Sequence, residues 1–183
     1  MINIDELYNK YINTVSSKQA TADIDIIKFM MEKINEYKPA TVADMGSGFS
    51  SAVLSTYEYG SVDSVDDNYD WLDKTKAFLN EHDLHKEDQK IIHFVDFRLK
   101  KKKYDFVFYD IGMTRPTRIE HMEETTTQNV NEGGYILYDD LHKGDLRKRL
   151  DHVKTVANLH FIGKTKIDEY GRFAELYQYR GLR

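Results

Sequence analysis

Acidic side chains follow the short apolar runs in the middle of this sequence. A single Asp in such a place is typical of a turn or a helix N-cap, because Asp is favoured at both. Repetition after five runs favours a shared acidic site, since carboxylates accept hydrogen bonds from hydroxyls, take up protons and bind hard cations. The acids are Asp44, Asp66, Asp96, Asp110 and the adjacent pair Asp139 and Asp140.

A pair of glycines, Gly46 and Gly48, stands in "VADMGSGFSSAVL" between an apolar run and a helical pattern. One interpretation is a tight strand-to-helix turn that requires φ above zero. The other is a ligand that lies against the backbone and the following helix N-terminus. Neither a third glycine, as in G-x-G-x-x-G, nor a G-K-[ST] follows, so the pattern indicates no cradle for a pyrophosphate or a triphosphate. A nucleoside is favoured, with Asp66 at the end of the next apolar run accepting hydrogen bonds from both ribose hydroxyls.

Short apolar runs alternate with helical periodicity from Thr41 onward, which predicts crossover connections and a mostly parallel sheet. Strands are expected over 41–46, 61–66, 91–97, 104–110 and 134–140, and helices over 3–17, 21–37, 49–59, 68–81, 117–130 and 143–158. Two last strands, 159–167 and 172–180, are joined by "DEYG" and predict an antiparallel hairpin at one edge. The fold class is therefore α/β: a Rossmann-like, open seven-stranded sheet with helices on both faces. Residues 1–38 are expected to form an N-terminal helical extension and residues 39–183 the main domain.

Composition limits the classes of function. The 183 residues include no Cys, which excludes disulfides, thiolate metal sites and cysteine nucleophiles. A net charge of −5 provides no global field for a phosphate backbone, so nucleic acid is not favoured as a partner. No run approaches 18 apolar residues and the first residues are acidic, so we expect a cytoplasmic protein that does not use a membrane.

In order and spacing, "DMGSGFS", "SVDSVDD", "FVDF", "YDFVFYD" and "GGYILYDD" resemble the motifs of class I S-adenosylmethionine-dependent methyltransferases. The resemblance covers about residues 40–180 and implies S-adenosylmethionine as cofactor. It implies that Asp44, Gly46 and Gly48 line its methionine and ribose portions and that Asp66 binds the ribose. It further implies that Val95 and Asp96 flank the adenine, while Asp110 faces the reactive methyl group and the substrate.

The methyl acceptor is expected to be an oxygen of a small molecule, sugar-like or phenolic. The loop after the fourth run reads "DIGM" and differs from the D/N-P-P-Y/F pattern of enzymes that methylate base amines. Divalent-metal-dependent O-methyltransferases are similar here, and this resemblance implies that Asp110, Asp139 and Asp140 hold Mg²⁺. Two positions depart from that subgroup: Asp140 replaces its Asn and Met113 its Lys. The alternative is that the acids cap a helix and polarise the substrate.

Other residues near the same edge are further candidates. Asp110, Asp139 and His142 are interpreted as catalytic, with His142 as a base. Arg115 and Arg118 are predicted to clamp an anionic substrate, or else are helix-face charges. Trp71 and Tyr69 cover the adenine or pack in the core.

The N-terminal helices and the activity itself leave alternatives open. Residues 1–38 form a lid that brings Tyr8, Tyr11 or Lys18 to the substrate, or a layer that covers the sheet edge. The other functions are methylation of RNA or protein, or binding of S-adenosylmethionine or a partner without chemistry. The oligomeric state is not indicated by the sequence.

Overall fold

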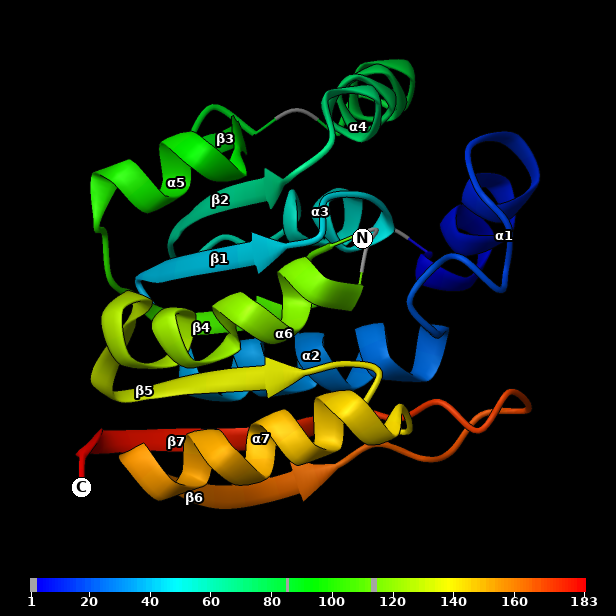
Figure 1. Ribbon diagram of the computed structural model, residues 1–183. Helices are drawn as coiled ribbons and strands as arrows, with labels where there is room; N and C mark the ends of the chain where they lie inside the picture. The colour runs from blue at the N-terminus through cyan, green and yellow to red at the C-terminus, as the bar shows by residue number, and fades with distance from the viewer. Residues whose placement is uncertain (1–2, 85, 113–114) are drawn as a thin grey trace.

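A computed structural model describes residues 3–84, 86–112 and 115–183 of the chain. These residues form a seven-stranded sheet with the order β3-β2-β1-β4-β5-β7-β6 (Figure 1). Strands β1 to β5 pair in parallel, and β7 runs antiparallel to both β5 and β6. The fold class expected from the sequence is thus confirmed, including the C-terminal hairpin. The strands are β1 (Thr41–Met45), β2 (Ser61–Asp66), β3 (Gln89–His93), β4 (Tyr104–Tyr109), β5 (Val130–Tyr138), β6 (Ala157–Lys164) and β7 (Glu175–Leu182).

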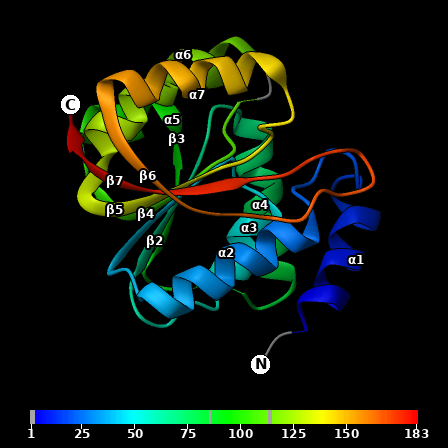
Figure 2. The same ribbon diagram turned by 90° about the horizontal axis from the view of Figure 1, so that it is seen from below.

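Helices cover both faces of the sheet (Figure 2). Successive side chains of a strand point to opposite faces of the sheet. Val42 and Phe106 therefore belong to the core on one face, and Ala43 and Val107 belong to the core on the other face. The first core contains residues of α1 (Ile4–Thr14), α2 (Ile24–Tyr37), α3 (Phe49–Leu54) and α4 (Tyr69–Glu81). The second contains residues of α5 (Phe94–Lys100), α6 (Arg115–Glu124) and α7 (Gly144–Val156). None of the helices in the described ranges is long and apolar enough to span a bilayer.

The expected strand over 91–97 is wrong beyond His93, where the chain turns into α5. The His93 ring accepts a hydrogen bond from the Val95 N–H at 3.3 Å and caps the new helix. Phe94 and Phe97 are then buried one helical turn apart. The apolar spacing of this segment is helical rather than alternating, which is the signal that distinguishes the two structures.

Several expected helices have different ends, and two of them show why. The helix expected over 49–59 ends at Leu54, where the hydroxyls of Ser55 and Thr56 donate to the backbone carbonyls of Ala52 and Val53, both at 2.7 Å. Such local hydrogen bonds compete with continuation of the helix. The helix expected over 117–130 is α6 followed by one turn of π-helix, η1 (Thr125–Asn129), and the residue at 130 already belongs to β5.

Helix α2 belongs to the core of the sheet, because Ile27, Met30 and Ile34 are fully buried in it. Helix α1 lies beyond the carboxyl ends of β1 and β2 (Figure 1). The segment between the two helices is held by Arg172, which precedes β7 and donates from Nη1 to the carbonyls of Gln19 at 3.1 Å and Thr21 at 2.8 Å. The N-terminal part of the chain is therefore tied to the C-terminal hairpin, and its lid function stays a prediction.

Gly46, directly after β1, lies against the backbone of the neighbouring strand end. Its φ is +112°, and a Cβ atom added there would lie 2.7 Å from the carbonyl oxygen of Asp110. A Cβ added at Gly48 would lie 2.8 Å from the hydroxyl of Tyr11. Packing of the protein thus requires a glycine at 46, whereas the close neighbour of Gly48 is the end of a side chain. The alternative of a ligand that lies against this backbone stays a prediction.

Replacing Gly46 with alanine should destabilise the fold strongly. The new methyl group would meet the Asp110 backbone, and the positive φ adds strain, so we expect a loss of about 2–4 kcal/mol in the free energy of unfolding. Urea denaturation measures this loss. The control is Gly144→Ala in α7, where an added Cβ meets nothing within 4 Å and the stability should change by less than about 1 kcal/mol. Equal midpoints for Gly46→Ala and the wild type would contradict this account.

Candidate functional site

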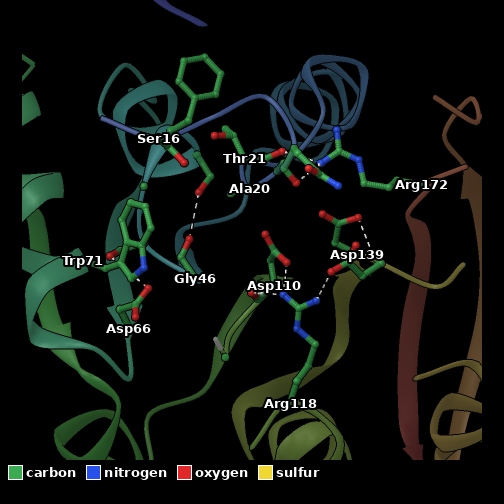
Figure 3. A pocket seen from close by; sticks show the side chains of 18 of the residues that line it. Ser16, Ala20, Thr21, Gly46, Asp66, Trp71, Asp110, Arg118, Asp139 and Arg172 are labelled. Atoms are coloured by element: carbon green, nitrogen blue, oxygen red, sulfur yellow. Dashed lines mark hydrogen bonds and ion pairs between the residues drawn. The ribbon is translucent and has the colours of Figure 1, made fainter. Parts of the chain in front are cut away.

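A cavity of about 610 Å³ opens at the carboxyl ends of β1, β2, β4 and β5. The strand order reverses between β1 and β4, and open α/β sheets bind ligands at such a point. The strand ends are level there, because Met45 pairs with Tyr109 and Tyr109 with Tyr138. Asp66 and Trp71 lie on one side of the cavity and Asp139 and Arg172 on the other (Figure 3).

The β1–β2 side combines a bare backbone with one carboxylate. Gly46, Gly48 and Asp66 all line the cavity. The carboxylate of Asp66 accepts the N–H of Asn68 at 3.0 Å and the hydroxyl of Ser47 at 3.4 Å, so it is fixed in place. Burial raises the pKa of Asp66 to about 7. This side could therefore accept hydrogen bonds from a pair of hydroxyls next to the two glycines of the turn.

The aromatic candidates behave differently from each other. Trp71 lines the cavity beside Asp66 (Figure 3). Tyr69 is 68% exposed and stacks on His93 with ring centroids 4.2 Å apart. Of the two, Trp71 is placed to cover a flat ring in the cavity.

Asp44 lies beneath the glycine turn, fully buried and outside the cavity lining. The Ser51 hydroxyl donates to its carboxylate at 2.5 Å and accepts the Gly48 N–H at 3.1 Å. Burial raises the pKa of Asp44 to about 7, against the lowering effect of its serine donors. The structure thus places Asp44 as a support of the turn that carries Gly46 and Gly48.

Val95 and Asp96, predicted to flank an adenine, lie in the first turn of α5 and not in the cavity lining. The chain enters this helix at Phe94, which turns Phe94 and Phe97 inward. Val95 is 56% exposed as a result, and Asp96 is exposed as well. Their contact with an adenine stays a prediction.

Three carboxylates and one guanidinium meet at the ends of β4 and β5, and we call Asp110, Asp139, Asp140 and Arg118 the acidic corner. Arg118 Nη1 donates to Asp140 at 2.5 Å, and Nη2 donates to the carboxylate and carbonyl oxygens of Asp110. Its Nε donates to the carbonyl of Ile111 at 2.7 Å. Figure 3 shows the side chain reaching from α6 toward Asp110. The predicted clamp on an anionic substrate is therefore largely engaged with the protein itself.

The three carboxylates differ in electrostatic environment. Burial raises the pKa of Asp110 to about 6 although Arg118 opposes it. Burial also raises the pKa of Asp139 well above its usual value, and the charges of Asp110 and Asp140 add to the effect. Burial also acts to raise the pKa of Asp140, but the positive charges of Arg118 and Lys143 outweigh this effect, so the pKa of Asp140 is lowered. Asp139 is thus the carboxyl at the corner most readily protonated.

The acidic corner does not fit the predicted Mg²⁺ site. Within residues 3–84, 86–112 and 115–183, no three His, Asp or Glu side chains are grouped so as to hold a metal ion. The guanidinium of Arg118 bonds both Asp110 and Asp140, where a divalent cation would need their oxygens as ligands. From the sequence, Arg118 was considered as a substrate ligand or a helix-face charge, so its pairing with Asp110 and Asp140 was missed.

The remaining candidates divide by position. His142 lines the cavity with Nδ1 3.7 Å from Asp140, and burial lowers its pKa below the usual value. A neutral imidazole of this kind can act as a base. The side chain of Arg115, the other predicted clamp, lies outside the described part of the chain.

Several lining residues were not singled out from the sequence. Arg172 is one of them, and its position follows from contacts between the two ends of the chain that no local pattern reveals. Tyr11 was named only as a lid candidate. The others come mainly from the segment between α1 and α2 and from the β1–α3 turn, and they include Ser16, Gln19, Ala20, Thr21, Ser47 and Ser50.

Comparison with known proteins finds similarity in structure only. No family model and no curated sequence matches the chain. An O-methyltransferase from Bacillus cereus in complex with S-adenosylhomocysteine superposes with a TM-score of 0.71 at 12% identity, over 96% of this chain and 90% of its own. The O-methyltransferase TomG from Streptomyces achromogenes, in complex with S-adenosylmethionine, gives 0.73 at 12% identity, over 97% and 89%. A methyltransferase from Podospora anserina with bound S-adenosylhomocysteine gives 0.68 at 11% identity, over 97% and 87%. The chain has the class I methyltransferase fold over nearly its whole length.

The raised pKa of Asp66 predicts a pH-dependent stability. The pKa of Asp66 in the folded state, about 7, exceeds the usual 3.8. Protonated Asp66 therefore stabilises the folded state fully below pH 4, and this contribution is lost as the pH rises through 7. Asp66→Asn removes this loss and should be more stable than the wild type at pH 8, by about 1–2 kcal/mol because solvent in the cavity screens the charge. Urea titrations at pH 4 and 8 measure it. A difference between the two proteins that is the same at both pH values would count against the assignment.

Proposed function

We propose that this protein is an S-adenosylmethionine-dependent methyltransferase that acts on a hydroxyl oxygen of a small molecule. The observation that carries the proposal is one cavity at the switch point of the sheet, with Asp66 and the glycine turn on one side and the acidic corner on the other. Its volume of about 610 Å³ lies in the range of about 300–1,000 Å³ usual for small-molecule sites. Three proteins of the same fold were crystallised with this cofactor or its demethylated product.

The cofactor is proposed to lie along the β1–β2 side. Asp66 accepts hydrogen bonds from the ribose hydroxyls, and Trp71 lies beside it, where it can cover a ring. The turn at Gly46 and Gly48 forms part of the cavity wall next to it. Bound S-adenosylmethionine supplies a methyl group on a sulfonium, and negative charge in the cavity favours such a cation. The acceptor then fits between the turn and the acidic corner.

Asp139 is proposed to take the proton of the acceptor hydroxyl. It lines the cavity, and its carboxylate accepts a hydrogen bond from the backbone N–H of Asp140 at 2.5 Å. During transfer the oxygen bonds to the methyl carbon, the carbon–sulfur electron pair stays on sulfur, and the hydroxyl proton moves to the carboxylate. His142, on the same rim, is the second candidate for this role. No step is assigned to a metal ion, since the acidic corner does not fit one.

Asp66→Ala should weaken binding of S-adenosylhomocysteine by about 10-fold to 100-fold, because two hydrogen bonds to a charged acceptor are lost. Isothermal titration calorimetry measures the affinity. Asp70→Ala is the matched control, since Asp70 is an exposed acid in the first turn of α4 and lies outside the cavity lining. No binding of either cofactor form by the wild type would end the cofactor assignment, and equal affinities of Asp66→Ala and the control would place the ribose elsewhere.

Asp139→Asn should lower kcat by about 100-fold or more while the affinity for S-adenosylhomocysteine stays within a factor of about 3. The assay follows formation of S-adenosylhomocysteine with a panel of phenols and sugar-like hydroxyl compounds. Because the pKa of Asp139 is raised, wild-type activity should increase with pH until the carboxyl is ionised. Full activity of Asp139→Asn would transfer the role to His142, and cofactor binding without turnover on any of these compounds would favour a binding module.

A further inference from the structure

Arg118 is built into the protein more firmly than a substrate ligand would be. Its side chain is only 8% exposed. The hydroxyl of Tyr109, itself fully buried, donates to the Arg118 carbonyl at 2.7 Å and so fixes this turn of α6 against the end of β4. The guanidinium then donates from Nε, Nη1 and Nη2 to protein oxygens. Both its backbone and its head group are therefore positioned by the fold.

The guanidinium satisfies two carboxylates that belong to different strands. Asp110 follows β4 and Asp140 follows β5, and Arg118 bonds both of them. Lys143 adds a second cation at Asp140 from the side of α7. Buried carboxylates require such compensation, since an unpaired buried charge costs several kcal/mol. A divalent cation at the same oxygens would have to displace Arg118 and deprive a buried guanidinium of both carboxylate partners.

We propose that the Arg118 guanidinium is the resident cation of the acidic corner and stands in place of a divalent metal ion. Arg118 is thus a positioning residue: it holds Asp110 and Asp140 and leaves Asp139 as the carboxylate available to the cavity. Only the link to the methyl acceptor rests on the proposed function. The replacement of a metal by Arg118 is independent of it and can be tested on the protein without any substrate.

The test measures binding of Mn²⁺, followed by the loss of the electron paramagnetic resonance signal of free Mn²⁺. The wild type should show no binding at the corner up to about 1 mM Mn²⁺, the weak end of the range of dissociation constants of protein Ca²⁺ sites. Arg118→Ala frees the carboxylates of Asp110 and Asp140 beside Asp139 and should bind Mn²⁺ at least 10-fold more tightly than the wild type. The double variant Arg118→Ala with Asp110→Asn should lose that gain.

The matched control is Arg147→Ala. It also removes an arginine that pairs with a part-buried acid, Glu175, at 2.7 Å, but it frees one carboxylate and should gain no Mn²⁺ binding. If Arg118→Ala does not fold, Arg118→Gln replaces it, because the amide nitrogen of Gln ends near the position of Nε, which donates to the carbonyl of Ile111. In either folded variant, Mn²⁺ should raise the melting temperature, whereas it should not raise that of the wild type.

Two results would overturn the inference. One is Mn²⁺ binding by the wild type at micromolar concentration that Asp110→Asn abolishes, because the corner would then accept a metal with Arg118 present. The other is a folded Arg118→Ala or Arg118→Gln that binds Mn²⁺ no better than the wild type. Neither result depends on whether S-adenosylhomocysteine binds, so failure of this inference and failure of the proposed methyltransferase function are distinguishable.

Discussion

The close approach of Gly46 to the backbone of Asp110 is the constraint on which the site depends. It brings the ends of β1 and β4 together at the point where the strand order reverses. The Asp110 N–H completes the contact by donating to the carbonyl of Met45 at 2.7 Å. A side chain at Gly46 would separate the two strand ends. The distance between Asp66 and the acidic corner is thus determined by packing of the protein, before any ligand is bound.

Burial of carboxylates at this edge of the sheet is energetically unfavourable. Asp63 shows how such a carboxylate is stabilised elsewhere in the protein. Asp63, inside β2, accepts hydrogen bonds from the Tyr104 hydroxyl at 2.6 Å and from Lys102 at 2.8 Å. It is a structural acid with a hydroxyl and a cation as partners. Asp139 is equally buried, but its carboxylate accepts a backbone N–H, from Asp140, and forms no ion pair with the described residues. An acid left in this state is a candidate for chemistry.

The fold could be predicted from the sequence because the patterns that indicate it are local. They are the alternation of strand and helix patterns and the turn residues between the last two strands. The positions of Asp66, Asp110 and Asp139 at one edge follow from the fold class alone. Short segments were harder, because the helical spacing of Phe94 and Phe97 overlaps an apolar run that also suits a strand. The partner of Asp110 and Asp140 could not be predicted, since Arg118 approaches them through a turn of α6 whose direction depends on tertiary packing.

The wall of the cavity formed by the segment between α1 and α2 depends on the opposite end of the chain. Arg172 pairs with Asp168 at 2.6 Å and donates to the carbonyls of Gln19 and Thr21. Segments that open readily have few buried contacts, whereas the Arg172 side chain is only 10% exposed. These contacts favour a fixed covering layer over a freely moving lid. Access for a cofactor would then be expected through the open rim of the cavity, with the loop 15–23 remaining attached to the hairpin.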